Sequence, residues 1–277
     1  MTDIIAPLGK RPVAPASDYP IPRYSLASRM RGWLGWLLLI ALLAWSWSPS
    51  EMFRVSALFT DWRNMAEFGG GFLRPNFNDW QQYITDMVVT IQIAIWGTAL
   101  AVVFGIPFAI LSSANICPVW IVQPVRRLMD SCRAINEIVF ALLFVVAVGL
   151  GPFAGVMALF IHNLGVFSKL FSEVVESVDP RPVEGIRVTG AVRVQEVIFG
   201  VIPQVMPLWS SFTLYRLETN VRSATTLGIV GAGGIGQTLY ESIRSFQYAE
   251  TAAQIIIVVL TVMVLDVISA RIRKALV

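Results

Sequence analysis

Residues 183–204 read VEGIRVTGAVRVQEVIFGVIPQ, a polar segment that lies between two apolar stretches of a very hydrophobic chain. Asp179-Pro180-Arg181-Pro182 precedes it, and proline ends one helix but fits well in the first turn of the next. Gly190 then permits a sharp bend between two short helices, at a cost of about 1 kcal/mol relative to alanine. We expect Pro203 to close the second helix just before the next apolar stretch. Because short helices are marginal alone, the segment is expected to be held by a partner surface.

The segment resembles the motif by which permeases of binding-protein-dependent ABC importers dock onto their ATPase. The motif reads Glu-Ala-Ala, three residues, Gly, nine residues, Ile-x-Leu-Pro. Glu184, Gly190 and Pro203 match it, and Ile202 stands in for the leucine. These four are the candidate ATPase-coupling residues, and an amphipathic loop at the lipid surface is the alternative. The chain departs from the motif at Gly185, Ile186 and Gly200.

Composition independently sets the class of protein. The chain has 277 residues, of which 56% are hydrophobic and 14% charged, with a mean hydropathy of +0.67. An average soluble domain carries about 25% charged residues, so this chain is an integral membrane protein. The net charge of +3 does not indicate nucleic acid, because the cations lie at the ends of apolar stretches rather than on one face.

The apolar stretches predict an all-α membrane protein with about six spans. Residues 1–31 are proline-rich and polar, which predicts a disordered cytoplasmic tail, and residues 32–277 form the transmembrane permease domain, with the coupling loop at about 179–204. Residues 50–82 mix charged and aromatic side chains and are expected to form an interfacial stretch. The six predicted spans are Trp33–Trp47, Ile84–Ser112, Arg127–Leu150, Phe153–Val175, Gln204–Thr226 and Thr251–Ala270.

Basic residues predict the orientation of these spans. An N-terminus inside the cell places most Lys and Arg residues in cytoplasmic segments, and only Arg54, Arg63, Arg74 and Arg244 on the other side. This asymmetry puts both termini and residues 179–204 in the cytoplasm. We therefore expect a multi-pass protein of the bacterial inner membrane.

A GxGxxG string at residues 231–236 does not indicate a dinucleotide site. Such a site needs the string between a strand and a helix, and here it follows an apolar span. We expect a glycine-rich turn on the outer side, where small residues let helices from two subunits approach closely. The residues assigned to this inter-subunit packing are Gly231, Gly233, Gly234 and Gly236.

Ionisable and amide residues inside the spans are candidates for the substrate pathway, because a charge in a bilayer is costly and usually faces a pore or a partner. Glu218 and Arg222 are four residues apart on a helix and can instead simply neutralise each other. A lone His162 in a membrane helix is more often hydrogen-bonded between helices than a proton relay. The candidates are Glu137, His162, Arg216, Glu218, Asn220 and Arg222.

The sequence contains no catalytic arrangement of its own. Paired carboxylates in an accessible cleft, a Ser/His/Asp set and a P-loop lysine are all missing, and no metal-ligand spacing occurs. The chain is therefore expected not to be an enzyme and to hold no metal.

Three stretches resemble the permease subunit of bacterial phosphonate ABC importers: residues 123–155, 184–207 and 215–236. The combination of CRAIN-E, the turn at residues 149–152 and ETNVRSATTLGIVGAGGIG is more specific than the docking motif. The methionine importer permease has a similar GAGG turn and less likeness elsewhere. The resemblance implies the type I ABC importer permease fold.

The resemblance also implies partners and a mechanism. A second permease copy, as a homodimer, would complete the pathway, with two cytoplasmic ABC ATPase subunits beneath and a periplasmic phosphonate-binding protein above. ATP and Mg would bind the ATPase, so this chain would bind no cofactor, and it would contact lipid but no nucleic acid. Transport would proceed by alternating access. An importer for phosphate, phosphite or methionine is the nearer alternative, and an ATP-independent secondary transporter is the alternative from another class.

Overall fold

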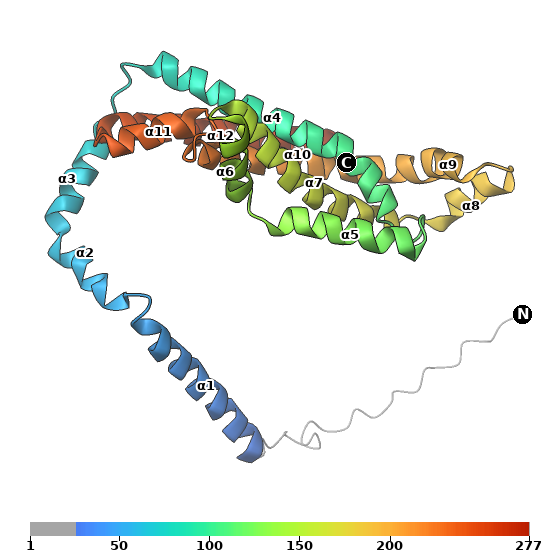
Figure 1. Cartoon of the computed structure of the whole chain (residues 1–277), viewed down its shortest axis with the longest axis horizontal. Helices are drawn as coiled ribbons and strands as arrows, with labels where there is room; N and C mark the ends of the chain where they lie inside the picture. The colour runs from blue at the N-terminus through green and yellow to red at the C-terminus, as the bar shows by residue number, and fades with distance from the viewer. Residues whose placement is uncertain (1–25, 277) are drawn as a thin grey trace, which may run out of the picture. The chain divides into compact units, whose positions relative to one another are not determined.

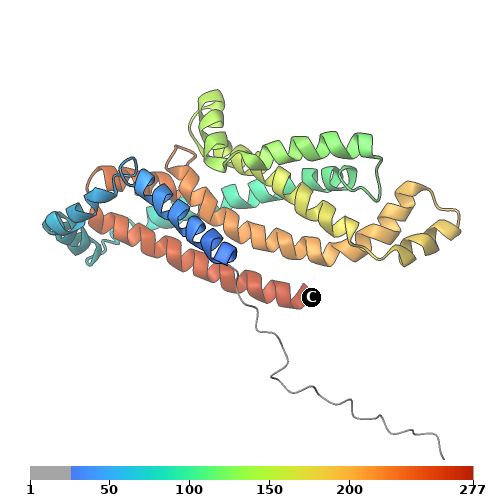
Figure 2. The same cartoon turned by 90° about the horizontal axis from the view of Figure 1, so that it is seen from below.

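The computed structural model describes residues 26–276, and all regular structure in this range is helical. The chain divides into two compact units, residues 1–65 and 66–277. The first helix, α1, is Leu26–Trp47 and therefore includes the last six residues assigned to the cytoplasmic tail. The rest of that tail lies outside the described residues. Figures 1 and 2 show the two units, which are considered separately below.

The first unit contains α1, η2 (Met52–Ser56), α2 (Ala57–Thr60) and the start of α3 (Trp62–Phe72). The apolar part of α1, Gly32–Trp47, is shorter than the roughly 20 residues that cross a bilayer core. Trp33 and Trp45 are 71% and 78% exposed and mark its two ends, as aromatic residues do at membrane interfaces. Short helices form much of residues 50–82, and the interfacial position expected for this stretch stays a prediction.

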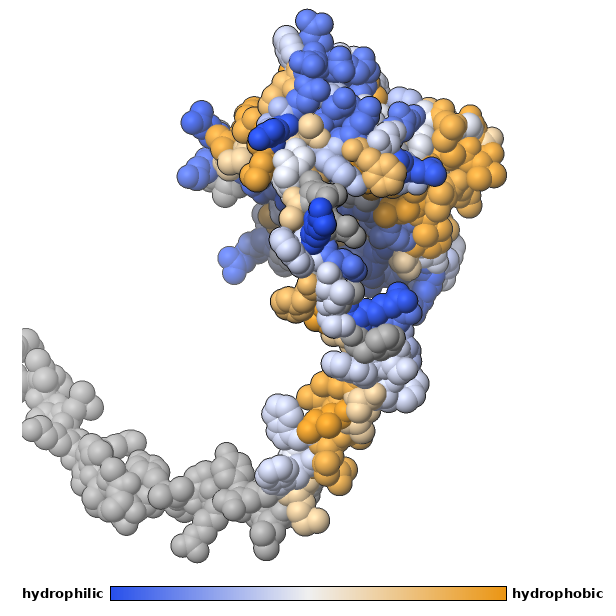
Figure 3. Space-filling view, turned by 90° about the vertical axis from the view of Figure 1, so that its left-hand side faces the viewer, coloured by the Kyte–Doolittle hydropathy of each residue, from blue (hydrophilic) through white to orange (hydrophobic). Residues whose placement is uncertain are grey.

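The second unit is built on long apolar helices. They are α4 (Trp80–Leu111), α7 (Pro152–Glu176), α10 (Ile202–Gly228) and α12 (Tyr248–Leu276). Within residues 26–276, four helical stretches are long and apolar enough to cross a membrane, or five if one bent pair counts as a span. Side chains on α12 are mostly not buried within this chain, as expected for a helix that contacts lipid or another subunit. Apolar residues cover one flank of the unit in Figure 3.

The bent pair corrects the predicted span Arg127–Leu150. Instead of one helix, the chain forms α5 (Val119–Ala134) and α6 (Glu137–Val148), which meet at 86°. Ile135 leaves the helical conformation, and the Asn136 side chain caps α6 by accepting a hydrogen bond from the Ile138 amide. An asparagine side chain competes with the helix backbone for amide hydrogens. The span was predicted from its apolar residues, which do not report such competition, so the break was not predicted.

Small residues bring α4 and α7 together. A Cβ atom on Gly97 would lie 2.7 Å from the Leu159 Cβ, and one on Gly105 would lie 3.2 Å from the Phe167 Cβ. The α4 positions facing this contact are buried and small, which permits the close backbone approach common between membrane helices. Farther toward the coupling loop, the Phe171 and Trp209 rings stack at 4.7 Å and join α7 to α10.

The glycine-rich turn leads into α11 (Ile235–Arg244) and packs within the chain. A Cβ on Gly233 would lie 3.0 Å from the Pro152 ring, and one on Gly236 would meet the Thr225 carbonyl. The Thr90 hydroxyl accepts a hydrogen bond from the Ile235 amide at 2.9 Å. These contacts within the chain explain why the residues of the turn are small. The expected contact between this turn and a second subunit stays a prediction.

Gly165 gives a test of the helix packing. We expect Gly165→Ala to lower stability, because its Cβ would lie 2.7 Å from the Arg133 backbone nitrogen and also meet the Met129 carbonyl. Overpacking against backbone costs about 1–3 kcal/mol. The measurement is the thermal unfolding midpoint of the detergent-solubilised protein. Gly185→Ala is the control, since its Cβ has nothing within 4 Å, and equal midpoints for both variants would contradict the packing.

Candidate functional site

The coupling loop begins with α8 (Pro180–Val188), which Asp179 caps by accepting a hydrogen bond from the Arg181 amide at 3.0 Å. The Gln204 side chain holds this start in place. Its Oε1 accepts from the Asp179 amide at 3.2 Å, and its Nε2 donates to the Gly200 carbonyl at 2.6 Å. Because Gln204 belongs to α10, the loop is attached directly to a long helix.

The bend at Gly190 is confirmed. Its φ of +83° lies in the region that glycine adopts readily and other residues avoid. Across the bend, the Arg187 guanidinium donates to both carboxylate oxygens of Glu196, from Nε and Nη2, each at 2.9 Å. This paired geometry is the strong form of an ion pair, and the Glu196 hydrogen bonds raise the pKa of Arg187. The pair joins the two arms of the loop.

The second arm differs from the prediction. It contains α9 (Arg193–Gln195) and the π-helical segment η3 (Glu196–Val201), and both continue into α10. Pro203 therefore does not close a helix; it lies in the first turn of α10. Proline has no amide hydrogen to donate to the preceding turn, and π-type turns accommodate such local departures from the α-helical ladder.

Gly200 brings the two arms into contact. A Cβ at this position would lie 3.1 Å from the Val183 Cα and 3.3 Å from the Ile186 Cδ1. The loop exposes apolar side chains beside its charged ones, since Val188, Val194 and Phe199 are 87%, 66% and 65% exposed. A protein contact over the loop would remove these side chains from water.

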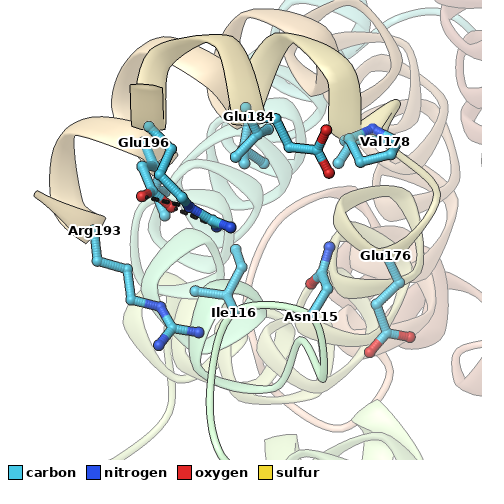
Figure 4. Close-up of a pocket in the computed structure, with 12 residues that line it drawn as sticks. Asn115, Ile116, Glu176, Val178, Glu184, Arg193 and Glu196 are labelled. Carbon is cyan, nitrogen blue, oxygen red and sulfur yellow. Dashed lines mark hydrogen bonds and ion pairs between the residues drawn. The ribbon is translucent and has the colours of Figure 1, made fainter. Parts of the chain in front are cut away.

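A cavity of about 400 Å³ lies between the loop and the end of α7 (Figure 4). Glu184 and Arg193 line it from the loop, and Asn115 and Glu176 line it from the opposite side. Asn115 donates to the Val175 carbonyl at 2.8 Å, and Glu176 accepts hydrogen bonds from the Ala114 amide and from Arg126. The segment between α4 and α5 is thus fixed beneath the loop. Glu184 forms no ion pair in the described part of the chain.

The predicted pathway residues have different partners, and Arg216 is partly buried. Arg216 on α10 donates from Nε and Nη2 to the Asn163 Oδ1 of α7, at 3.2 and 2.6 Å. Asn163 is fully buried and also donates to the Leu159 carbonyl at 2.8 Å. No carboxylate within residues 26–276 forms an ion pair with Arg216. Its positive charge is therefore held by a neutral amide.

Glu137 and His162 lie at the break between α5 and α6. The His162 Nδ1 lies 2.9 Å from the Ile135 carbonyl, and its Nε2 lies 3.7 Å from a Glu137 oxygen. Glu137 also accepts a hydrogen bond from the Ser223 hydroxyl at 2.9 Å. His162 is thus hydrogen-bonded between helices, which favours the structural interpretation over a proton relay.

Asn220 and Glu218 have separate partners. Asn220 donates to the Thr98 hydroxyl of α4 at 2.7 Å and is buried. Glu218 pairs with Arg222 at 2.7 Å and with Arg273 at 3.7 Å. Arg273 belongs to the basic end of α12. Glu218 thus has two cationic neighbours, and Glu218 and Arg222 neutralise each other.

Two acidic residues, Glu196 and Asp266, are not among the site residues predicted from the sequence. Glu196 could have been found from its position six residues beyond a glycine bend, with Arg187 three residues before it. Asp266 is a single carboxylate in an apolar stretch of α12, and its Oδ1 is buried without a hydrogen-bond partner in the described structure. An acidic residue inside a membrane helix is a signal that the sequence itself offered.

Comparisons with known proteins match this architecture. The family described as "Binding-protein-dependent transport system inner membrane component" matches residues 101–277. The "Putative cryptic phosphonate transport system permease protein PhnE1" of Escherichia coli (strain K12) is 56% identical over 137 residues, which cover 48% of this chain and 66% of that protein. The "Phosphite transport system permease protein PtxC" of Stutzerimonas stutzeri is 38% identical over 212 residues, covering 76% and 77%.

A solved structure shows the same fold. The inward-facing MetNI methionine ABC transporter contains a chain that matches with a TM-score of 0.64 at 19% identity, over 73% of this chain and 99% of that one. The fold is that of a type I ABC importer permease, as the sequence predicted.

The ion pair across the bend gives a test of loop rigidity. We expect Glu196→Gln to speed amide hydrogen exchange in residues 183–201 by roughly three- to tenfold, because a charge-assisted pair joining the two arms is lost. The measurement is hydrogen–deuterium exchange in detergent micelles. Glu173→Gln is the matched control, since Glu173 pairs with Lys169 on α7 and not with the loop. Unchanged exchange in the Glu196 variant would contradict the role of the pair.

Proposed function

The chain belongs to the binding-protein-dependent transport system inner membrane component family, and from this premise we propose that it is the permease of an ATP-driven importer of phosphonates. The observation that carries the coupling role is the loop at residues 179–204. It is attached to α10 through Gln204, bent at Gly190 and closed by Arg187 and Glu196. A stiff loop of this kind can transmit movement of an attached ATPase to the long helices.

Phosphonate is the substrate class supported by the identity to the Escherichia coli permease. Phosphite is the second candidate, because the phosphite permease of Stutzerimonas stutzeri matches a larger share of the chain. Both are small phosphorus oxyanions, so the same cationic pathway serves either. Uptake into vesicles with a phosphonate-loaded or a phosphite-loaded binding protein distinguishes them, and uptake that needs neither ATP nor a binding protein would support the ATP-independent secondary transporter instead.

The proposed assembly contains two copies of this permease, two cytoplasmic ATPase subunits and a periplasmic binding protein. ATP and Mg bind the ATPase, and both termini of the permease lie in the cytoplasm. The exposed apolar surface of the coupling loop supports ATPase contact on that side. Closure of the ATPase dimer pulls the loops, and the spans exchange inward- and outward-facing arrangements.

The coupling role predicts that two changes uncouple the machine without unfolding it. Glu184→Lys reverses an exposed charge in the first arm of the loop, and Gly190→Pro imposes a negative φ where the structure has +83°. We expect each to lower binding-protein-stimulated ATP hydrolysis by about tenfold or more, as for loss of a central interface contact. Gly185→Ala is the control with open space around its Cβ.

Co-purification of the ATPase and stimulated hydrolysis are measured together. Normal values of both in the Glu184 and Gly190 variants would exclude this loop as the ATPase contact.

Arg216 is proposed as the cation that serves the anion pathway, and Arg222 is not. A partly buried guanidinium held by a neutral amide has no carboxylate that an arriving oxyanion must displace, whereas Arg222 already pairs with Glu218. We expect Arg216→Gln to lower the uptake rate by roughly tenfold or more and Arg222→Gln to change it by less than about twofold. ATP-driven uptake in proteoliposomes at matched protein levels is the measurement. Equal effects of the two variants would exclude this assignment.

A further inference from the structure

A second polar cavity has a volume of about 480 Å³. Figure 1 shows α11 and the start of α4, which contribute to its wall, at the end of the second unit opposite α8 and α9. The first residues of α4 and α12 form its wall together with α11. Three carboxylates line it, those of Asp79, Glu241 and Glu250, and the described residues of its wall include no lysine, arginine or histidine. The cavity therefore carries negative charge on the side that faces away from the ATPase.

Helix ends explain part of this arrangement. Asp79 is the N-cap of α4, and Glu250 lies in the first turn of α12, where the helix dipole favours an acid. Nevertheless, the Asp79 side chain makes no capping hydrogen bond, and none of the three carboxylates forms an ion pair within residues 26–276. Within the described residues, the Glu241 carboxylate accepts a hydrogen bond from the Gln237 side-chain amide alone, at 3.0 Å. The helix dipoles favour acids at two of these positions, but no cationic side chain in residues 26–276 pairs with any of the three carboxylates.

A buried amide supplies a second, independent observation. Gln254 also lines the cavity and is fully buried. Its Nε2 donates to the Ser242 hydroxyl at 3.0 Å, which joins α12 to α11, and its Oε1 has no donor in the described structure. A buried acceptor without a donor is costly. The cavity thus combines three carboxylates with one buried amide oxygen that lacks a donor, and hydroxyl and amide side chains complete its wall.

We propose that this cavity receives a lysine or arginine side chain of the extracytoplasmic binding protein. Lysine and arginine head groups are donors without acceptors, so they complement this wall in both charge and hydrogen bonding. A metal ion fits less well, because no group of three His, Cys, Asp or Glu side chains in the described range is close enough to hold one. The proposal rests on the importer function, since it needs a binding protein on the outer side.

The test uses the permease–ATPase complex in lipid nanodiscs. ATP hydrolysis is measured against the concentration of substrate-loaded binding protein. We expect Glu241→Gln and Glu250→Gln each to raise the half-saturating concentration by about three- to tenfold, with the maximal and unstimulated rates unchanged, and to weaken its dependence on salt. Glu173→Gln is the control, because this acid lies on α7 away from the cavity and is expected to leave the value unchanged.

Two outcomes of this experiment distinguish a failure of the docking site from a failure of the importer function. If the binding protein stimulates the wild-type complex and the half-saturating concentration is the same in both cavity variants, the cavity is not a docking site and the importer function stands. If no concentration of binding protein stimulates the wild-type complex, the importer function fails and the inference fails with it. A change confined to the unstimulated rate would also overturn the inference, because docking would then be unaffected.

Discussion

The close approach of α4 and α7 is the constraint on which the rest of the second unit depends. Gly97 and Gly105 leave room for Leu159 and Phe167, so the two helices pack along most of their length. Membrane helices gain little hydrophobic energy from contact with one another, and such packing depends on dispersion contacts that only small residues allow. The position of α7 in turn places Asn163 and His162 inside the unit and places the start of the coupling loop at its end.

This helix packing gives the polar side chains of the spans different hydrogen-bond partners. Asn163 holds Arg216, Asn220 bonds to Thr98, and His162 fixes the break before α6. Each hydrogen bond satisfies groups that would be costly in a low-dielectric interior. Arg216 differs from the other pathway candidates because its charge is held by a neutral partner, which supports its proposed role in moving a small oxyanion.

The two ends of the second unit have contrasting surfaces. The coupling loop presents exposed apolar and charged side chains around the bend at Gly190, whereas the opposite end presents a cavity lined by carboxylates. A permease that receives its substrate from one partner and its movement from another needs contacts of different chemistry on its two sides. The fold connects these surfaces through α4, α7, α10 and α12.

Sequence alone determined the membrane class, the family resemblance and the bend at Gly190, because hydropathy, motif spacing and glycine chemistry are local properties. It also indicated that Glu218 and Arg222 can pair, since residues four apart on a helix are neighbours. The pairing of Arg187 with Glu196 was decided by tertiary structure, because the bend brings the two residues together. The break at Ile135 combines a local cap by Asn136 with a hydrogen bond from His162 of α7 to the Ile135 carbonyl. The continuous helix through Pro203 has a local cause, because the π-helical turns of η3 accommodate the proline. The difference between Arg216 and Arg222 was decided by tertiary structure, because only packing against α7 shows which cation lacks a carboxylate.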